Sequence, residues 1–393
     1  MSHLISSSPA TILLVDDEPV SRLSMAARLK RMGLRVLEAA NGKEGLDLLR
    51  RERPDLTILD WVMPDMDGPT ICETVRQDPE ILSSQIILMT SHDQPDQIAE
   101  GLARGADDFL SKSASKQEII ARVQSGLRAA SLVRSIESAR DELRSKQHQL
   151  EAELHSAAQY IRSLLPAPGS VASELRMAWQ YRPSLALGGD LFNIGRWQDA
   201  SIFFYILDAS GHGVSPALRA ASLSTFLRPE NLQHYMTSND PADILMEANR
   251  QYPLTEEGSY FTLWIGSLNL SNRTLQYATA GHGGAVLQRR TGTIEWLKSP
   301  QLPLGFAPET IYTAHTVTLQ PGDRLVLMSD GIYEAPAPTG EVWGTERLAT
   351  SLATLQSTPL ADALPALMAE AERWHGAPVF PDDAALFGME FAA

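Results

Sequence analysis

The chain has 393 residues, with 33 Lys and Arg against 48 Asp and Glu, so its formal net charge is −15. This negative charge repels a phosphate backbone and argues against nucleic acid as a partner. The first residues lack a basic segment followed by an apolar stretch, and no window approaches the roughly 18 apolar residues of a membrane helix. We therefore expect a cytoplasmic protein that has no membrane partner. The single cysteine, Cys72, is predicted to pack as a small hydrophobic residue.

Residues 10–125 alternate short apolar runs with amphipathic stretches, which is typical of βαβ units. Strands are predicted at 11–15, 35–39, 56–59 and 85–89, and helices at 21–32, 43–51 and 68–77. This order predicts a doubly wound α/β domain of the flavodoxin type, with a parallel sheet covered by helices on both faces. In such a domain the functional groups gather at the carboxyl ends of the strands.

Several polar residues of this domain stand where predicted strands end. They are Asp16, Asp17, Asp60, Thr90 and Lys112. Phosphoryl transfer to a carboxylate needs a magnesium ion that neutralises the incoming phosphate, and magnesium prefers carboxylate oxygens. Because the strand ends meet at one edge of a parallel sheet, the sequence predicts a magnesium-assisted phosphorylation site there.

The motifs Leu-Leu-Val-Asp-Asp-Glu, Leu-Asp-Trp-Val-Met-Pro-Asp-Met-Asp-Gly and Met-Thr-Ser resemble the receiver domain of the response regulator family. The resemblance implies that Asp60 accepts a phosphate from a cognate histidine kinase, and that Asp16 and Asp17 hold Mg²⁺ with it. Thr90 becomes the hydroxyl that moves onto the phosphate, and Lys112 its cationic partner. Phe109 stands at the family's aromatic switch position, although plain core packing explains an aromatic residue there equally well.

Residues 126–166 are predicted to form a helical linker, with a continuous helix over 127–165. A heptad pattern places residues 133, 140, 147, 154 and 161 in one set and residues 136, 143, 150, 157 and 164 in the other. Arg140 and Gln147 interrupt the apolar seam. Two interpretations remain open: a parallel coiled coil in a homodimer, which we favour, or an amphipathic helix that lies on its own domains.

Residues 170–393 contain two groups of apolar, β-prone runs separated by helical patterns. Strands are predicted at 201–207, 260–270, 274–279, 285–288 and 324–328, and helices at 216–227, 241–251 and 360–374. Strands grouped in this way predict an α+β domain built as a β-sandwich flanked by helices.

Four aspartates of this second domain lie in short motifs at the ends or starts of apolar runs. They are Asp190, Asp208, Asp330 and Asp382. Two divalent ions about 3.5 to 4 Å apart hydrolyse phosphoesters by lowering the pKa of a bridging water and clamping phosphate oxygens. A bridging carboxylate must come from a rigid element, and Asp208 ends a predicted strand.

The order and spacing of these motifs resemble the SpoIIE-type branch of the metal-dependent serine/threonine phosphatases of type 2C. The resemblance implies that Asp208 bridges two Mn²⁺ or Mg²⁺ ions, with the Ala209 carbonyl as a neighbouring ligand. Asp330 and Asp382 then hold one ion, and Asp190 supports the other. His212 and His282 are expected to be structural.

Two positions depart from the family pattern. Asn193 replaces a frequent second aspartate, and Ala385 replaces the threonine of the closing Asp-Asp-x-Thr motif. A neutral oxygen at Asn193 would weaken a metal held there, so we expect a weak enzyme or one that needs a high metal concentration.

The leading interpretation is a two-component response regulator that dephosphorylates a phosphoserine or phosphothreonine protein. By resemblance, its substrate is a phosphorylated anti-sigma-factor antagonist in general stress control. The alternative is an adaptor of the RssB type, in which the phosphatase fold binds a sigma factor and delivers it for proteolysis. The four retained aspartates favour the enzyme.

Overall fold

The computed structural model describes residues 9–91, 95–167, 171–197, 201–377 and 379–392. The chain divides into two compact units, Met1–His148 and Gln149–Ala393, and each has its own hydrophobic core. Within the described ranges, no helix combines the length and the apolar character that crossing a membrane requires.

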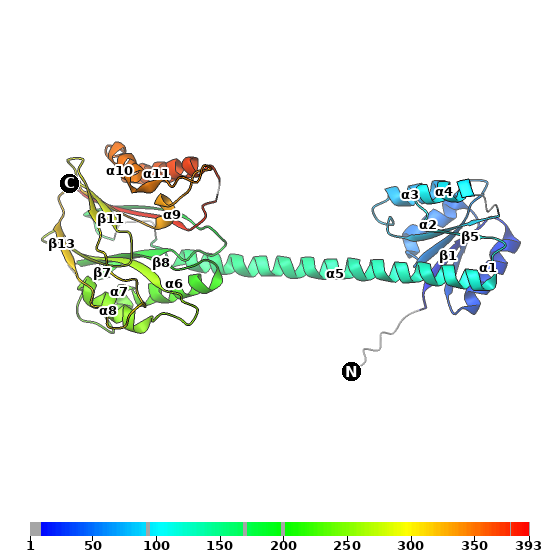
Figure 1. Ribbon diagram of the computed structural model, residues 1–393, viewed down its shortest axis with the longest axis horizontal. Helices are drawn as coiled ribbons and strands as arrows, with labels where there is room; N and C mark the ends of the chain where they lie inside the picture. Colours follow the sequence, from blue (N-terminus) through cyan, green and yellow to red (C-terminus); the bar gives the residue numbers. More distant parts are fainter. Residues whose placement is uncertain (1–8, 92–94, 168–170, 198–200, 378, 393) are drawn as a thin grey trace. The chain divides into compact units, whose positions relative to one another are not determined.

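The first unit is a five-stranded parallel sheet with helices on both faces (Figure 1). Its strands are β1 (Thr11–Val15), β2 (Arg35–Ala39), β3 (Leu56–Asp60), β4 (Gln85–Thr90) and β5 (Asp108–Ser111), in the order β2-β1-β3-β4-β5. Its helices are α1 (Pro19–Arg31), α2 (Gly42–Glu52), α3 (Gly68–Gln77), α4 (Pro95–Ala103) and the start of α5 (Lys116–Ser163). This confirms the doubly wound α/β prediction.

The buried strands of this sheet are apolar on both faces, because helices cover both. Ile12 and Leu14 of β1 pack with α1 and α5, whereas Leu13 and Val15 pack with α2 and α3. Cys72 is fully buried in the second of these layers, as predicted, and burial raises the pKa of its thiol to about 12.

The helix α5 differs from the predicted linker helix in two respects. It begins at Lys116 rather than at 127, because the last helix of the parallel-sheet unit continues into the linker without a break. In addition, the last positions of the predicted seam pack against the core of the second unit, which buries Ile161 and Leu164 and partly covers Leu154 and Ala157. That part of the seam is therefore an intramolecular contact.

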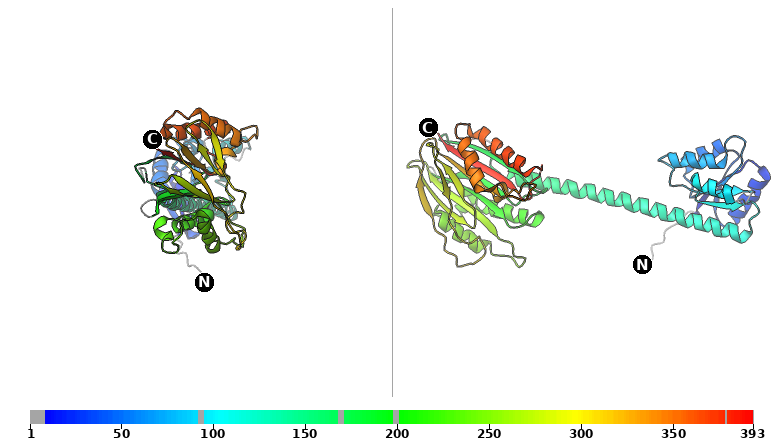
Figure 2. Two further views of the ribbon diagram at one scale, coloured as in Figure 1. Left: turned by 90° about the vertical axis from the view of Figure 1, so that its left-hand side faces the viewer. Right: turned by 45° about the horizontal axis from the view of Figure 1, so that its top comes forward.

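The second unit is a sandwich of two five-stranded sheets whose paired strands are all antiparallel (Figure 2). One sheet has the order β13-β10-β9-β8-β7, from β7 (Leu191–Trp197), β8 (Ser201–Ala209), β9 (Phe261–Asn269), β10 (Thr274–Ala280) and β13 (His315–Thr318). The other has the order β12-β11-β14-β15-β6, from β6 (Leu175–Arg182), β11 (Ala285–Gln288), β12 (Ile294–Leu297), β14 (Arg324–Met328) and β15 (Ala384–Phe391). The predicted α+β sandwich is confirmed.

Helices cover the outer faces of both sheets of the sandwich. The helices α6 (Val214–Phe226), α7 (Pro229–Leu232) and α8 (Pro241–Gln251) lie on the first sheet, and α9 (Asp330–Tyr333), α10 (Gly344–Thr354) and α11 (Leu360–His375) on the second.

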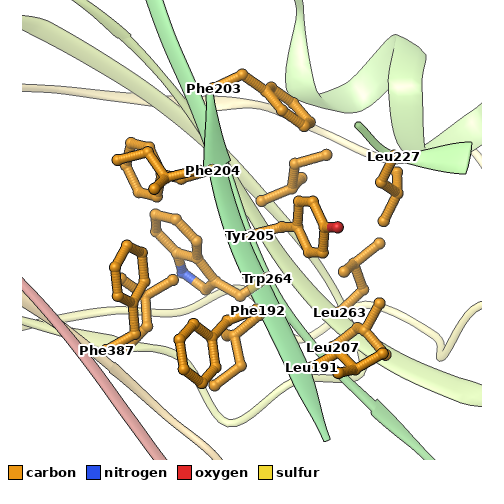
Figure 3. Close-up of a cluster of buried hydrophobic side chains, with 14 of the residues drawn as sticks. Leu191, Phe192, Phe203, Phe204, Tyr205, Leu207, Leu227, Leu263, Trp264 and Phe387 are labelled. Carbon is orange, nitrogen blue, oxygen red and sulfur yellow. The ribbon is translucent and has the colours of Figure 1, made fainter. Parts of the chain in front are cut away.

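Alternation along β8 divides its side chains between two layers (Figure 3). Phe204 stacks on Trp264 in the layer between the sheets, where Phe192 of β7 also stacks on Phe387 of β15 with ring centroids 5.2 Å apart. Tyr205 points to the helical layer, and its hydroxyl bonds to Ser224 of α6. These buried aromatic residues fix the register of the strands whose ends carry the site.

Candidate functional site

The carboxyl edge of the parallel sheet brings together the residues that the sequence singled out in the first unit. Carboxylate oxygens of Asp16, Asp17 and Asp60 lie within 4.8 Å of one another, so they can share one cation. Lys112 Nζ lies 2.7 Å from Asp60 Oδ2 and 3.7 Å from Asp16 Oδ2. Thr90 ends β4 and is 3% exposed, and its carbonyl accepts a hydrogen bond from the Lys112 backbone N–H.

The Lys112 ammonium partly neutralises the negative charges of Asp60 and Asp16 at this edge. Burial raises the pKa of Asp60, and the Lys112 ammonium partly opposes this rise. Burial lowers the pKa of Lys112, but its bond to Asp60 and the charge of Asp16 outweigh burial, so the net shift is upward. The lysine therefore stays charged next to the carboxylate that would receive a phosphate, and a divalent cation would remove the remaining repulsion.

Phe109, which the family resemblance places at an aromatic switch position, is partly buried and makes a side-chain contact. Its side chain is partly exposed on β5, and the Arg122 guanidinium of α5 lies 4.9 Å from the ring centroid. Arg122 also pairs with Asp108 at 2.6 Å. The aromatic ring is thus held by a cation–π contact from the helix that leaves this unit.

In the sandwich, the predicted aspartates gather at one end because of strand register. Leu191 pairs with Leu207, which places Asp190, immediately before β7, beside Asp208 near the end of β8. In the other sheet, β14 pairs antiparallel with β15, so Asp330 just after β14 and Asp382 just before β15 meet at the same edge.

The two pairs lie near each other, because the Asp383 carboxylate, next to Asp382, accepts the Asp190 N–H at 3.4 Å. Burial and the charges of Asp330 and Asp382 raise the pKa of Asp208 to about 7. Burial and the charge of Asp382 raise the pKa of Asp330 to about 6. Asp190 is 1% exposed, and burial and the charge of Asp208 raise its pKa well above the ordinary value. Its Oδ2 atom is buried without a hydrogen-bond partner.

These observations fit a pair of divalent cations. Cations would compensate the repulsion among the carboxylates and give the orphaned Asp190 oxygen a partner. Within the described residues, only Asp16, Asp17 and Asp60 bring three carboxylate oxygens within 4.8 Å of one another, so the four aspartates of the sandwich form a looser set than these three.

The Ala209 carbonyl lies beside the loop that carries Asp190. A Cβ atom added at Gly189 would come within 3.2 Å of the Ala209 oxygen, so glycine permits this approach. The Ala209 carbonyl therefore lies next to the residue that precedes Asp190.

Sequence reasoning missed the role of Asp383. This side chain is 5% exposed, and its Oδ1 accepts hydrogen bonds from the Ser184 N–H and Oγ, at 2.7 and 3.0 Å. Its Oδ2 accepts the N–H groups of Gly189 and Asp190, at 2.5 and 3.4 Å. A signal was present in the sequence, because neighbouring carboxylates before a strand tend to point to opposite sides, and only one of the pair can face a shared ion.

Asn193 is not placed as a metal-site residue. Its Nδ2 donates to the Leu164 carbonyl at 2.7 Å, just beyond the end of α5, and its Oδ1 accepts the Ile194 N–H at 2.7 Å. The predicted weakening of a metal through Asn193 therefore has no geometric basis, because the side chain instead ties β7 to the linker helix.

The two histidines differ in their surroundings. His282 is buried, burial lowers its pKa to about 4, and its Nδ1 accepts the Gly284 N–H, which agrees with a structural role. His212 is exposed, and its charge lowers the pKa of Asp382 against the larger upward effect of burial. The structural role expected for His212 does not follow from this position at the rim of the acidic cluster.

Comparison with known families matches both units. The family described as response regulator receiver domain matches residues 12–124, and the family described as Stage II sporulation protein E (SpoIIE) matches residues 198–392. The transcriptional regulatory protein AfsQ1 of Streptomyces coelicolor is 36% identical over 118 residues, which is 30% of this chain and 51% of that protein. The chain thus spans about half the length of the curated relatives it matches.

Two solved structures resemble the sandwich. The SiaA-PP2C domain of Pseudomonas aeruginosa is 21% identical with a TM-score of 0.54, and covers 63% of this chain and 98% of its own. The PP2C phosphatase domain of SpoIIE from Bacillus subtilis, with a fragment of its regulatory domain, is 18% identical with a TM-score of 0.50, and covers 56% of this chain and 64% of its own. At these identities the likeness shows a shared fold.

The raised pKa values predict how metal-free stability depends on pH. The folded sandwich holds the protons of Asp208 and Asp330 more tightly than the unfolded chain does, so this stabilisation is complete below about pH 4 and is lost as pH rises through 6 and 7. Asp208→Asn removes one negative charge. In EDTA at pH 8 we expect its sandwich to melt several degrees above the native one, whereas Mn²⁺ should raise the melting temperature of the native protein far more.

Thermal unfolding at pH 5, 6, 7 and 8, with EDTA or Mn²⁺, measures both effects. The electrostatic account is wrong if Asp208→Asn is no more stable than the native protein in EDTA at pH 8.

Proposed function

Because the chain joins a response regulator receiver domain to a phosphatase domain of the SpoIIE family with the PP2C fold, we propose that it is a phosphorylation-controlled protein phosphatase. Phosphorylation of Asp60 by a histidine kinase would control the metal-dependent hydrolysis of phosphoserine or phosphothreonine on a partner protein. The observation that carries the proposal is that strand register and the Asp383 contact bring Asp190, Asp208, Asp330 and Asp382 to one end of the sandwich. The domain limits proposed for this function are 10–125, 126–166 and 170–393.

The residues of the chain would divide the work as follows. Asp208, on a rigid strand end, would bridge two Mn²⁺ or Mg²⁺ ions, with Ala209 beside it, Asp190 on one side, and Asp330 with Asp382 on the other. Bound ions would supply an activated water and neutralise the phosphoryl oxygens. The aspartates hold and space the ions, and the buried aromatic layers beneath them keep that spacing rigid. In the receiver, Asp16 and Asp17 would hold Mg²⁺ beside Asp60.

The substrate that best suits this domain pair is a small phosphorylated anti-sigma-factor antagonist. Support for this choice is the resemblance to SpoIIE-type phosphatases described above. An adaptor that binds a sigma factor would use the same fold as a surface, and would have no need for raised pKa values at four converging carboxylates.

Removing the bridging carboxylate tests the enzyme directly. With Mn²⁺ and p-nitrophenyl phosphate or a phosphoserine peptide, Asp208→Asn should lower the rate by at least about a hundredfold, since each 1.36 kcal/mol of lost transition-state stabilisation costs tenfold. Asp362→Asn, an exposed aspartate in the first turn of α11, is the matched control and should retain the native rate.

A native rate in Asp208→Asn would refute the phosphatase. Sigma-factor binding that depends on Asp60 phosphorylation and ignores Mn²⁺ would then favour the adaptor.

Coupling between the domains would pass along α5. Phosphate on Asp60 would draw Thr90 inward and change the surface near Phe109, whose ring is held by Arg122 of α5. At its other end, α5 is followed by the Leu164 carbonyl that Asn193 binds, and Asn193 stands three positions after Asp190. A shift of the helix would therefore reach the segment that carries a metal ligand.

The Asn193 contact makes this coupling testable. With beryllium fluoride as a phosphate mimic on Asp60, the native phosphatase rate should change, and Asp60→Asn should abolish the change. Asn193→Ala should bring the ratio of rates with and without the mimic close to one, because the helix end loses its hold on β7. Equal native rates in both conditions would contradict the coupling.

The middle of α5 supports a homodimer. Each residue from 134 to 153 is exposed in the single chain, including Ile136, Leu143 and Leu150, which are 59%, 68% and 57% exposed. Helices in proteins gain most of their stability from packing an apolar face against a partner, and in the single chain this stretch has no such cover. These three residues repeat every seven positions, so a second copy of α5 packed in parallel would cover them.

Disrupting the seam should dissociate the dimer. Leu143→Asp places a charge in the seam and should yield a monomer in sedimentation analysis, whereas Ser145→Asp, on the opposite side of the same turn, should leave the dimer intact. Equal masses for the two variants would exclude this seam as the dimer contact.

A further inference from the structure

We propose that Asp383 is a positioning residue for metal binding. It acts through Asp190, as a latch that holds the Gly188-Gly189-Asp190 loop against the start of β15. The inference rests on the proposed function, because it concerns the same pair of ions. Asp383 itself would touch neither ion nor substrate.

Both carboxylate oxygens of Asp383 are hydrogen-bonded. The four hydrogen bonds that the Asp383 carboxylate accepts all come from one short segment of chain, that of Ser184, Gly189 and Asp190. Its backbone is also engaged, since its N–H donates to Asp382 Oδ1 at 2.8 Å and its carbonyl accepts from Ser329 Oγ at 3.1 Å. Asp383 is therefore hydrogen-bonded to three parts of the site: the loop that carries Asp190, Ser329, which precedes Asp330, and the side chain of Asp382.

Glycines make room for this latch on both sides. A Cβ atom at Gly188 would lie 2.7 Å from Asp383 Oδ2 and 2.1 Å from the Tyr181 hydroxyl. A Cβ atom at Gly331 would lie 2.1 Å from the Asp383 carbonyl oxygen. The close approach is thus built into the backbones of both the Asp190 loop and the Asp330 turn.

The latch explains how Asp190 can stay where it is. Its carboxylate is buried with one unpartnered oxygen, so a free loop would swing it toward water. The hydrogen bonds that Asp383 accepts from the backbone N–H groups of Gly189 and Asp190 oppose that movement. Groups that orient a metal ligand typically change metal affinity by 10 to 100-fold when they are removed.

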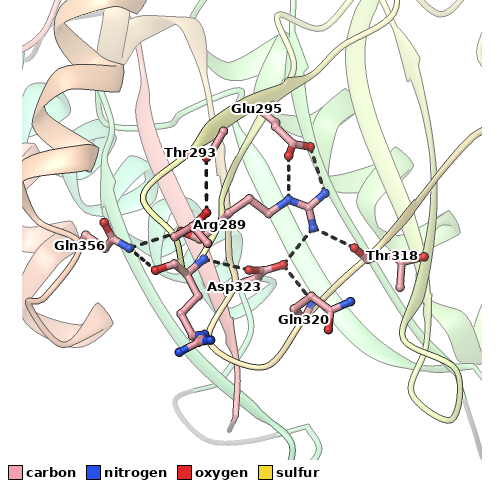
Figure 4. Close-up of polar contacts among 9 residues, drawn as sticks. Arg289, Thr293, Glu295, Thr318, Gln320, Asp323 and Gln356 are labelled. Carbon is pink, nitrogen blue, oxygen red and sulfur yellow. Dashed lines mark hydrogen bonds and ion pairs between the residues drawn. The ribbon is translucent and has the colours of Figure 1, made fainter.

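A second buried aspartate provides a matched control at the opposite end of β15. Asp323 is 3% exposed and accepts hydrogen bonds from the Arg290 N–H, the Gln320 N–H and Arg289 Nη1, at 2.9, 2.9 and 3.0 Å (Figure 4). Its backbone pairs with Phe391 at the end of the strand. Like Asp383, Asp323 is buried and fixes a loop, but its hydrogen bonds and ion pair within the described residues reach none of the aspartates of the acidic cluster. A variant of Asp323 therefore shows how much of any effect comes from a less stable fold rather than from weaker metal binding.

The experiment compares Asp383→Asn, Asp323→Asn and Ser184→Ala in the full chain. Titration calorimetry with Mn²⁺ measures affinity, and melting in EDTA measures the metal-free fold. Both asparagine variants should have a lower melting temperature in EDTA than the native protein. Asp383→Asn should weaken Mn²⁺ binding by roughly 10 to 100-fold at one of two sites, Ser184→Ala should weaken it a few-fold because it removes one of four bonds, and Asp323→Asn should bind like the native protein. High Mn²⁺ should restore the phosphatase rate of Asp383→Asn.

Native Mn²⁺ affinity in both Asp383→Asn and Ser184→Ala would overturn the inference and leave Asp383 a structural residue like Asp323. If Asp383→Asn does not fold, the Mn²⁺ affinity of Ser184→Ala alone decides: a few-fold loss supports the positioning role, and native affinity overturns it. A native protein that binds no Mn²⁺ would instead overturn the proposed phosphatase, and the positioning role with it.

Discussion

Repulsion among like charges at one end of the sandwich is the constraint on which the second unit depends. Strand register forces Asp190 and Asp208 together from one sheet and Asp330 and Asp382 together from the other. Such a cluster is unfavourable for folding, so its presence needs an external compensation. The cluster lies at the place where, in the proposed phosphatase, carboxylates would hold the cations.

The fold opposes this repulsion with neutral and aromatic contacts, to which the charge of His212 at the rim of the cluster adds. The layer around Trp264 and Phe387 sets the distance between the sheets, and Asp383 fixes the Asp190 loop through backbone N–H groups. Basic side chains elsewhere in the sandwich pair with other acids, as Arg289 does with Glu295 and Asp323. This division leaves the negative field of the cluster available to metal ions.

Much of this arrangement could be predicted from the sequence, because local patterns determine it. The strand at 285–288 and the helix at 241–251 have the predicted bounds, since a short apolar run and a helix start with an Asp cap followed by Pro are both local signals. The meeting of the receiver residues followed from a topological rule, because ends of parallel strands share one edge.

What could not be predicted depends on partners that are distant in sequence. A heptad pattern shows that one face of a helix is apolar, but it does not say what covers that face. The favoured interpretation packed Leu154 and Ile161 against a second helix, whereas they pack on their own domain, as the alternative allowed. Likewise, Asn193 looked like an altered metal ligand because its real partner, the Leu164 carbonyl, is a backbone atom with no sequence signature. Asp383 was hidden for the same reason, since its partners are mostly backbone amides.

The two ends of α5 are packed into hydrophobic cores and its middle is exposed, which has an evolutionary consequence. Its first turns are integral to the receiver core through Ile119 and Val123, and its last turns to the sandwich core through Ile161, whereas no residue between 134 and 153 is buried. That central stretch is where gene fusion could exchange one sensory module for another without repacking either core. Insertions of whole heptads would be tolerated there more readily than other lengths, because they preserve the angular phase between the two ends.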